Sequence, residues 1–472
     1  MTHAYRTHVD AMDDSTGPVS LAPAPNWCGP TAGGILTTEA IDRSLTFLKG
    51  GKHYRAGTPD ASQRTAYEIA KSDFNEILSS KNLTFLFGSG CSSHAPNGSD
   101  EHGIPTMGPL AQGLLAPENI DVANQYGLTT EIRRTLEADL GIDLADPDYA
   151  WNLERLMEVL FGFQFALAKT QKAELRSSKT ALDAAIESVK RYVFDQCKSG
   201  QEAEASNTVL RFYQTFYRKL SQRSRSLPRP TIATTNYDLF NEIAMDRIGV
   251  PHINGFLGSV EKRFNPASFR YTLAQRLDLT SQRWTSLDNL VYFLKLHGSL
   301  NWHAVDTGLF PVEERPLSES GDGKAMLIYP TPAKQNASFA APYSDMFREF
   351  QNKIVQEQSA LVTVGYSFGD EHVNNSIYQA LTIPTFRLVI FSKPELGTKT
   401  SNKNVKMLQE LNDPRIWIIG TEDSNATWKA HYFKEFVDDI MPTGNNDPAD
   451  QAVERVMNLF ASLNKDSDDG DK

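Results

Sequence analysis

Four short stretches carry the side chains that could do chemistry, and each one follows an apolar run. The stretches are residues 88–92 (GSGCS), 234–238 (TTNYD), 295–299 (KLHGS) and 365–370 (GYSFGD). Glycine and serine allow a phosphate to approach the backbone closely, and carboxylate and imidazole groups transfer protons. Together these residue types favour chemistry on a small phosphate-bearing molecule, such as a nucleotide.

The first stretch, 88–92, follows the apolar run 83–87, which is typical of a buried strand. Its glycines permit a tight turn, its serines can donate hydroxyl groups to phosphate oxygens, and its backbone N–H groups are expected to stay open. A doubly wound sheet receives a nucleotide phosphate at such a place. No lysine follows at Walker spacing, and Ser93 stands where a dehydrogenase fingerprint has its third glycine. A tight turn without a ligand is the alternative.

The second stretch places Asn236 and Asp238 two residues apart, with Thr235 beside them, after the apolar run 231–235. Ligands bind at the carboxyl ends of strands in parallel sheets, so an amide and a carboxylate here are candidates for substrate contact. The alternative is that one of them only caps the helix expected over 239–249.

The third and fourth stretches also lie at strand ends. His297 is followed by Gly298, which removes side-chain bulk beside it, and then by Trp302. Imidazole is the side chain best suited to proton transfer near neutral pH, although a lone histidine is more often structural. Gly365 and Ser367 belong to a second small-residue turn between a strand and a helix. Two such turns suit a ligand with two halves, such as a dinucleotide.

The elements that must position these residues alternate between strands and helices. Short apolar runs that end in small or polar residues predict strands at 83–88, 231–235, 291–299, 360–367, 387–392 and 416–420. Between them, the spacing of Val373, Ile377 and Leu381 predicts a helix with one apolar face. The sequence therefore predicts an α/β fold, a Rossmann-like doubly wound parallel sheet.

One segment interrupts this alternation, because residues 148–225 show only helical spacing of apolar residues and no strand pattern. We interpret it as a helical module inserted into the sheet domain. The predicted organisation is an irregular arm (1–60), the first part of the sheet domain (61–147), the helical module (148–225), the remainder of the sheet domain (226–440) and a C-terminal helix with an acidic tail (441–472).

Composition limits the classes of function. The chain of 472 residues has a formal net charge of −11, which argues against broad electrostatic attraction to nucleic acid or anionic lipid. No apolar run approaches the ~20 residues needed to cross a bilayer, and the start of the chain does not read as a secretory signal. The cysteines Cys28, Cys91 and Cys197 are scattered singly, so neither a structural zinc site nor a disulfide framework is expected. We expect a cytoplasmic protein.

The four stretches, in this order and each at a strand end, resemble the sirtuin family, and most closely its bacterial SIR2-like branch. The resemblance covers roughly residues 80 to 425. It implies a sirtuin fold that binds NAD+ as substrate, and it implies the following sites. The phosphate loop would be Gly88, Ser89, Gly90 and Ser92; the nicotinamide-ribose end would be Thr235, Asn236 and Asp238; the base toward a ribose hydroxyl or water would be His297; and the loop near the adenosine half would be Gly365 and Ser367. Thr106 falls where the family's Gly-Ile-Pro loop covers the cofactor.

The departures from the family point to the reaction. Protein deacylases of this family carry a four-cysteine zinc module, and this chain has no such ligands. It also shows no counterpart of the strand that pairs with an acyl-lysine peptide. Water is then the expected acceptor, and the resemblance implies an NAD+ glycohydrolase (NADase) with Asn236 and His297 as catalytic residues and no zinc or further cofactor.

Two alternatives stay open at this level. One is an NAD-dependent protein deacylase of the same family, and the other is a module that senses NAD or ADP-ribose without catalysis.

The resemblance also implies a biological setting. Members of the SIR2-like branch deplete NAD+ in defence against phage, so restraint until a trigger arrives is expected. A homo-oligomer and a separately encoded partner, such as a HerA-type ATPase, are the implied forms of control. No membrane and no direct nucleic-acid contact are expected.

Overall fold

The structure is a computed structural model, and its described residues all fall within one compact unit, Arg43–Lys472. The described residues are 44–55, 64–95, 102–168, 172, 175–276, 283–305, 310–319, 325–327, 342–397 and 402–442. Most of the predicted N-terminal arm and almost all of the predicted C-terminal helix and tail therefore lie outside the described residues. Residues 46–54, which the sequence analysis assigned to the arm, form two strands.

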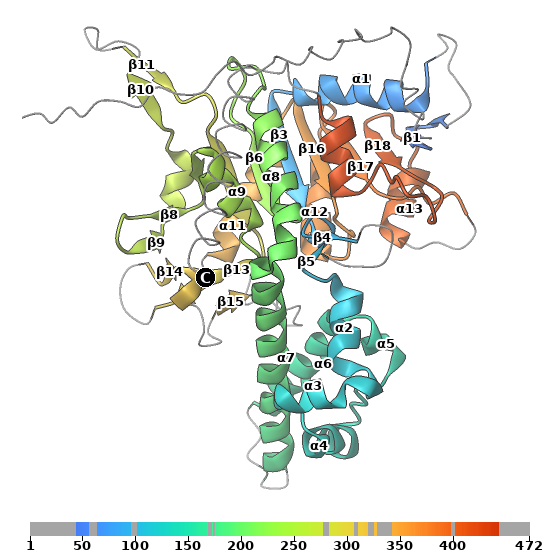
Figure 1. Ribbon diagram of the computed structural model, residues 1–472, viewed down its shortest axis with the longest axis vertical. Coiled ribbons are helices and arrows are strands. Elements are labelled where there is room, and N and C mark those ends of the chain that lie inside the picture. Colours follow the sequence, from blue (N-terminus) through green and yellow to red (C-terminus); the bar gives the residue numbers. More distant parts are fainter. Residues whose placement is uncertain are drawn as a thin grey trace, which may run out of the picture. The chain divides into compact units, whose positions relative to one another are not determined.

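A nine-stranded sheet organises this unit (Figure 1). Its order is β2 (Lys52–Tyr54), β1 (Thr46–Lys49), β18 (Ile416–Gly420), β17 (Arg387–Phe391), β16 (Ser359–Val364), β3 (Asn82–Phe87), β6 (Thr231–Thr234), β12 (Val291–Lys295) and β7 (His252–Ile253). The strands from β18 to β7 are parallel, while β1 and β2 add antiparallel pairs at one edge. This confirms the predicted Rossmann-like α/β fold.

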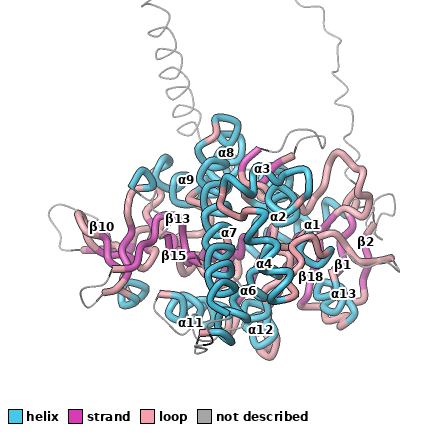
Figure 2. The backbone as a smooth tube through the Cα atoms, turned by 90° about the horizontal axis from the view of Figure 1, so that it is seen from below, coloured by secondary structure: helices cyan, strands magenta, loops and turns pink. Residues whose placement is uncertain are grey.

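The parallel strands are apolar because helices cover both faces of the sheet. Side chains of β3 alternate, so that Phe85 and Phe87 enter one core and Leu86 enters the other. Figure 2 shows the strands between two layers of helices. The first layer holds α1 (Ala66–Leu78), α8 (Asn207–Leu220), α9 (Phe240–Ile248) and a π-helix (Phe436–Ile440), and the second holds α11 (Tyr343–Ile354), α12 (Glu371–Ala380) and α13 (Lys403–Glu410).

A run of helices separates β3 from its neighbour β6, and it starts earlier than predicted. It comprises α2 (Met107–Leu115), α3 (Ile120–Gln125), α4 (Thr130–Leu140), α5 (Pro147–Ala150), α6 (Leu153–Leu167), α7 (Arg176–Glu202) and α8. In Figure 1, α2 to α6 gather along α7, away from the sheet. Their pattern was weak in the sequence, because α2 contains Gly and Pro and α4 buries only Leu136. The last helix, α8, instead packs on the sheet, where the Phe216 ring lies 5.0 Å from that of Phe85.

The predicted strand 291–299 is divided between two sheets. β12 ends at Lys295, and β13 (Gly298–Ala304) starts in a five-stranded sheet of order β15 (Ala325–Leu327), β13, β14 (Val312–Glu314), β9 (Lys262–Phe264) and β8 (Phe256–Leu257). His297 therefore lies in the turn between the sheets.

The remaining elements are short. They are the hairpins β4 (Ser93–His94) with β5 (His102–Gly103) and β10 (Ala274–Arg276) with β11 (Trp284–Ser286), the α-helical turn α14 (Phe433–Glu435), and the 3-10 turns Ser89–Cys91, Pro117–Asn119, Glu204–Ser206, Pro266–Arg270 and Leu317–Glu319. Among the described residues, no helix combines the length and apolar character that a membrane span requires.

Candidate active site

The four predicted stretches converge on one cavity of about 370 Å³ at the carboxyl ends of β3, β6, β12 and β16. From β3 the sheet continues to β6 on one side and to β16 on the other, so the loops after these three strands border the cavity at the edge of the sheet where ligands bind in such folds. Of the ten predicted site residues, eight line this cavity: Gly88, Ser89, Ser92, Thr235, Asn236, Asp238, His297 and Ser367. Gly90 and Gly365 do not.

Glycine is needed at positions 88, 90 and 365 because the two loops that carry these residues pack backbone against backbone. A Cβ atom on Gly88 would lie 2.4 Å from the carbonyl oxygen of Gly365, and one on Gly90 would lie 2.9 Å from the Gly365 Cα. Gly365 also has a φ of +63°, which side chains rarely adopt. These glycines let two loops touch at the floor of the cavity, and they do so whether or not a ligand is present.

The open N–H groups are not where the sequence placed them. The amides of Gly88, Gly90, Cys91 and Ser92 all donate to carbonyl oxygens of the protein, because the loop forms a 3-10 turn against the end of β16. The amides of residues 366–369 make no hydrogen bond within the described part of the chain. The anion-binding capacity of the backbone therefore lies in the second loop, just before α12, rather than in the first.

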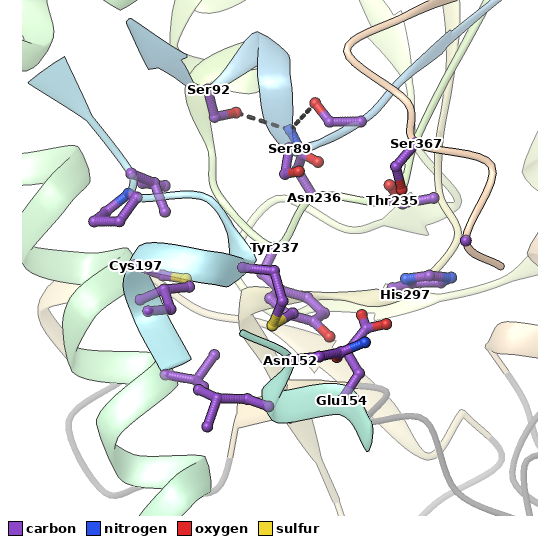
Figure 3. A pocket seen from close by; sticks show the side chains of 18 of the residues that line it. Ser89, Ser92, Asn152, Glu154, Cys197, Thr235, Asn236, Tyr237, His297 and Ser367 are labelled. Atoms are coloured by element: carbon purple, nitrogen blue, oxygen red, sulfur yellow. Dashed lines mark hydrogen bonds between the residues drawn. The ribbon is translucent and has the colours of Figure 1, made fainter. Parts of the chain in front are cut away.

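Ser92 is the centre of a buried hydrogen-bond network. Its hydroxyl donates to Asp238 Oδ2 at 2.6 Å. It also accepts from Asn236 Nδ2 at 2.8 Å, a hydrogen bond drawn in Figure 3. The Tyr213 hydroxyl lies 3.1 Å away and must be the donor, since a serine hydroxyl has one hydrogen. Ser92 has therefore no hydrogen left for a phosphate, and it positions Asn236 and Asp238 instead.

The Asn236 side chain is held with its oxygen available. Its amide nitrogen donates to the Gly88 carbonyl oxygen at 2.9 Å as well as to Ser92, which uses both N–H groups. No hydrogen bond to the carboxamide oxygen is found among the described residues. Asn236 can thus accept a hydrogen bond from a water or a ribose hydroxyl.

A buried ion pair supports the loop that carries Tyr237 and Asp238. Lys295 Nζ lies 3.1 Å from Glu242 Oε1 and also donates to the carbonyl oxygens of Tyr237 and Asp238. The second oxygen of Glu242 has no hydrogen-bond partner in the described structure. Burial raises the pKa of Glu242 to about 7, although Lys295 opposes this shift.

His297 faces a carboxylate from the neighbouring loop. Its Nε2 lies 2.8 Å from Asp370 Oδ2, yet the approach is not that of a hydrogen bond, and Nε2 is buried without a hydrogen-bond partner among the described residues. The other oxygen of Asp370 caps α12 by accepting from the amides of His372 and Val373. His297 is thus 8% exposed and lies beside a carboxylate.

The helical segment supplies a wall of the cavity that the sequence analysis missed. Trp151, Asn152 and Glu154, between α5 and α6, line it together with residues of α7 such as Cys197. Ile104 and Pro105, of the Gly-Ile-Pro stretch, also line it. Thr106 does not line it and stands at the N-cap position of α2 without a side-chain capping hydrogen bond. No local pattern marks the corner between α5 and α6, because only the packing of these helices against α2 and α7 brings it to the site.

The cavity is acidic. Its lining includes the carboxylates of Glu154, Asp238 and Asp370 but, within the described residues, neither lysine nor arginine. The Cys197 thiol is no nucleophile, since burial and then Asp238 raise its pKa to about 12. No group of three or more His, Cys, Asp or Glu side chains that could hold a metal occurs among the described residues.

The comparison with protein families matches the second half of this site. Residues 230–407 match the model of the SIR2-like domain. The matched segment is SIR2-like. It includes β6, β12 and β16 and three of the four stretches, while the stretch at 88–92 precedes it. No curated protein matches the chain.

Structural comparison finds 75 matching chains of solved structures. Two of them are Sir2 homologue mutants in complex with ADP-ribose, one with a serine-to-alanine and one with a phenylalanine-to-alanine substitution. Their sequence identities are 12% and 14% and their TM-scores 0.27 and 0.25, and each match covers 74% of this chain and 95% of the other. At these TM-scores they do not bear on the geometry of the site.

Proposed function

We propose that this chain is an NAD+ glycohydrolase, which cleaves the bond between nicotinamide and ribose to give nicotinamide and ADP-ribose. One observation carries the proposal: a single cavity brings the free carboxamide oxygen of Asn236 together with the buried imidazole of His297, whose Nε2 lies 2.8 Å from Asp370 Oδ2. The SIR2-like match supports NAD-related activity, because such domains typically belong to NAD-using enzymes.

The proposed reaction needs little covalent help from the protein. The bond between the ribose C1′ and the nicotinamide nitrogen breaks, and its electron pair stays on nicotinamide, which becomes neutral. Positive charge then develops on the ribose, and a water held by the Asn236 oxygen adds to C1′. His297 accepts the proton of that water. Asp238, fixed by Ser92, supplies negative charge nearby.

The rest of the substrate has a place in the same cavity. The pyrophosphate would lie against Ser89, Ser367 and the open amides of residues 366–369, at the start of α12. Since no lysine or arginine lines the described cavity, backbone dipoles must hold these phosphates. Water as the acceptor follows from the absence in this chain of the cysteines that a zinc-bearing deacylase carries.

The same proposal extends to a regulated effector that depletes NAD+ in the cytoplasm during anti-phage defence. Its support is the resemblance of the motifs to the bacterial branch. A homo-oligomer and a separately encoded partner, such as a HerA-type ATPase, would keep the activity in check, and neither zinc nor a further cofactor would be needed.

The test is release of nicotinamide from NAD+ by the purified full chain, followed by chromatography. Asn236→Ala and His297→Ala should each lower the rate by about 100- to 10,000-fold, because each removes a positioned group. Asn75→Ala and His53→Ala are matched controls, since both side chains are exposed and lie outside the cavity, on α1 and β2. Tight binding of NAD+ without release, or full activity of the His297 variant, would contradict the proposal.

A further inference from the structure

The lining of the cavity combines open amides with carboxylates. Ser89, Ser367 and the open amides of 366–369 suit an anion. Asp370, which follows these amides and caps α12, lies beside His297. Figure 3 shows Asn152 and Glu154 on the His297 side, away from Ser89. The helical segment thus adds a second carboxylate on the His297 side of the cavity.

Glu154 is free to act on a ligand. It stands in the first turn of α6, is half-buried, and makes no hydrogen bond or ion pair within the described chain. Its neighbours on the helix behave differently: Arg155 and Glu158 pair with each other at 2.6 Å on the surface. Asn152 caps the helix by accepting from the Arg155 amide, which fixes the turn that carries Glu154.

The field of Glu154 reaches the same place as that of Asp370. The Tyr366 phenol lines the cavity, and its pKa is raised by burial first, then by Asp370 and, to a smaller extent, by Glu154. Two carboxylates from separate parts of the chain therefore act on one side chain of the cavity lining, Tyr366. His297 itself, more than nine-tenths buried, leaves Nε2 without a hydrogen-bond partner in the described structure.

We propose that Glu154 is a substrate-contacting residue that selects the cationic nicotinamide ring of NAD+ and stabilises the positive charge as it passes to the ribose. This inference rests on the proposed function and adds a residue from the helical segment to it. Two negative charges without a lysine or arginine would repel an anion but attract a cation, and the nicotinamide riboside end is the cationic part of NAD+. Dihydronicotinamide in NADH is neutral, so the selection has a direct readout.

The kinetic test compares Glu154→Gln with Glu158→Gln. The first removes the charge at the cavity, and the second removes one on the same helix four residues further on, at the surface. Glu154→Gln should lower kcat/KM for NAD+ by about 10- to 100-fold, the effect of one partly solvated charge a few ångströms from a developing cation. Glu158→Gln should leave it unchanged, and Glu154→Asp should restore part of the loss.

The binding test does not depend on turnover. Calorimetry in the Asn236→Ala background, which should not consume NAD+ during the titration, should show at least about tenfold tighter binding of NAD+ than of NADH, and addition of Glu154→Gln should lower this ratio by about tenfold. No preference for NAD+ in this background, or a ratio that Glu154→Gln leaves unchanged, overturns the inference. If the wild type releases no nicotinamide while the ratio still falls in the variant, the proposed hydrolase fails and the charge selection stands.

Discussion

The buried Glu242 predicts an unusual loss of stability with rising pH. Its pKa lies at about 7 in the folded chain, against an ordinary value near 4.5. The folded state therefore keeps a proton that the unfolded state has already released between these values. Stability from this group is present below pH 4.5, falls as the pH rises, and is fully lost above pH 7.

The magnitude follows from the difference between the two pKa values. Between pH 5 and pH 8, wild type should lose about 2.5 kcal/mol relative to Glu242→Gln, which cannot titrate. In a unit of this size that is a relative change in Tm of about 3 °C. Only the change of this difference with pH is predicted. The substitution also changes the contact with Lys295, and we expect that effect on the free energy of unfolding to be the same at every pH.

Thermal unfolding of both proteins at matched scan rates over this pH range measures the difference. Glu76→Gln, an exposed substitution on α1, is the control and should follow wild type at every pH. A difference that stays constant, or that grows in favour of wild type as the pH rises, would refute the reasoning. The second outcome would mean that attraction to Lys295 exceeds the cost of burying the carboxylate.

Three further predictions concern the floor and walls of the cavity. Tyr213→Phe removes the donor to Ser92 but keeps the ring, so it should cost about 1 kcal/mol of stability in denaturant unfolding and lower nicotinamide release far less than Asn236→Ala. Gly365→Ala should cost at least about 2 kcal/mol of stability in the same assay, because its Cβ would lie 2.6 Å from the Cys91 amide nitrogen. The control, Gly141→Ala, has a similar φ and nothing within 4 Å of its Cβ, so it should cost only about 1 kcal/mol. Equal costs for the two substitutions would exclude the clash at Gly365. Cys197 should resist iodoacetamide at pH 8 in the native protein, as followed by mass spectrometry, and react only after unfolding, because so high a pKa leaves almost no thiolate.

The sequence predicted the frame of the site because apolar runs mark strands buried on both faces. Each of the six predicted strands is present, and the polar residues that follow them meet at one cavity. Parallel strands have their carboxyl ends at the same edge of the sheet, so residues far apart in the chain could be grouped from the sequence pattern alone. The break after Lys295 was not predicted, since the same apolar run supplies two sheets.

The role of each residue in the site depends on contacts that no local sequence pattern encodes. Ser92 was expected to hold a phosphate, but its hydrogen is directed to Asp238 by a tyrosine and an asparagine from two other elements. Glu154 lies on a helix whose apolar spacing indicates only a core. Its place at the cavity depends on how α6 packs against α2, α5 and α7, and this packing is tertiary.

The central position of β3 has a consequence for synthesis of the chain. Both of its partners come later, β6 at residue 231 and β16 at residue 359. At 5–20 residues per second, a ribosome reaches the end of β16 roughly 15–55 s after it has made β3. Both edges of this apolar strand stay unpaired until β6 is made, and the edge toward β16 stays unpaired for the whole interval, which is a template for aggregation. The nascent chain should therefore need a chaperone, and expression at a lower temperature should improve the soluble yield.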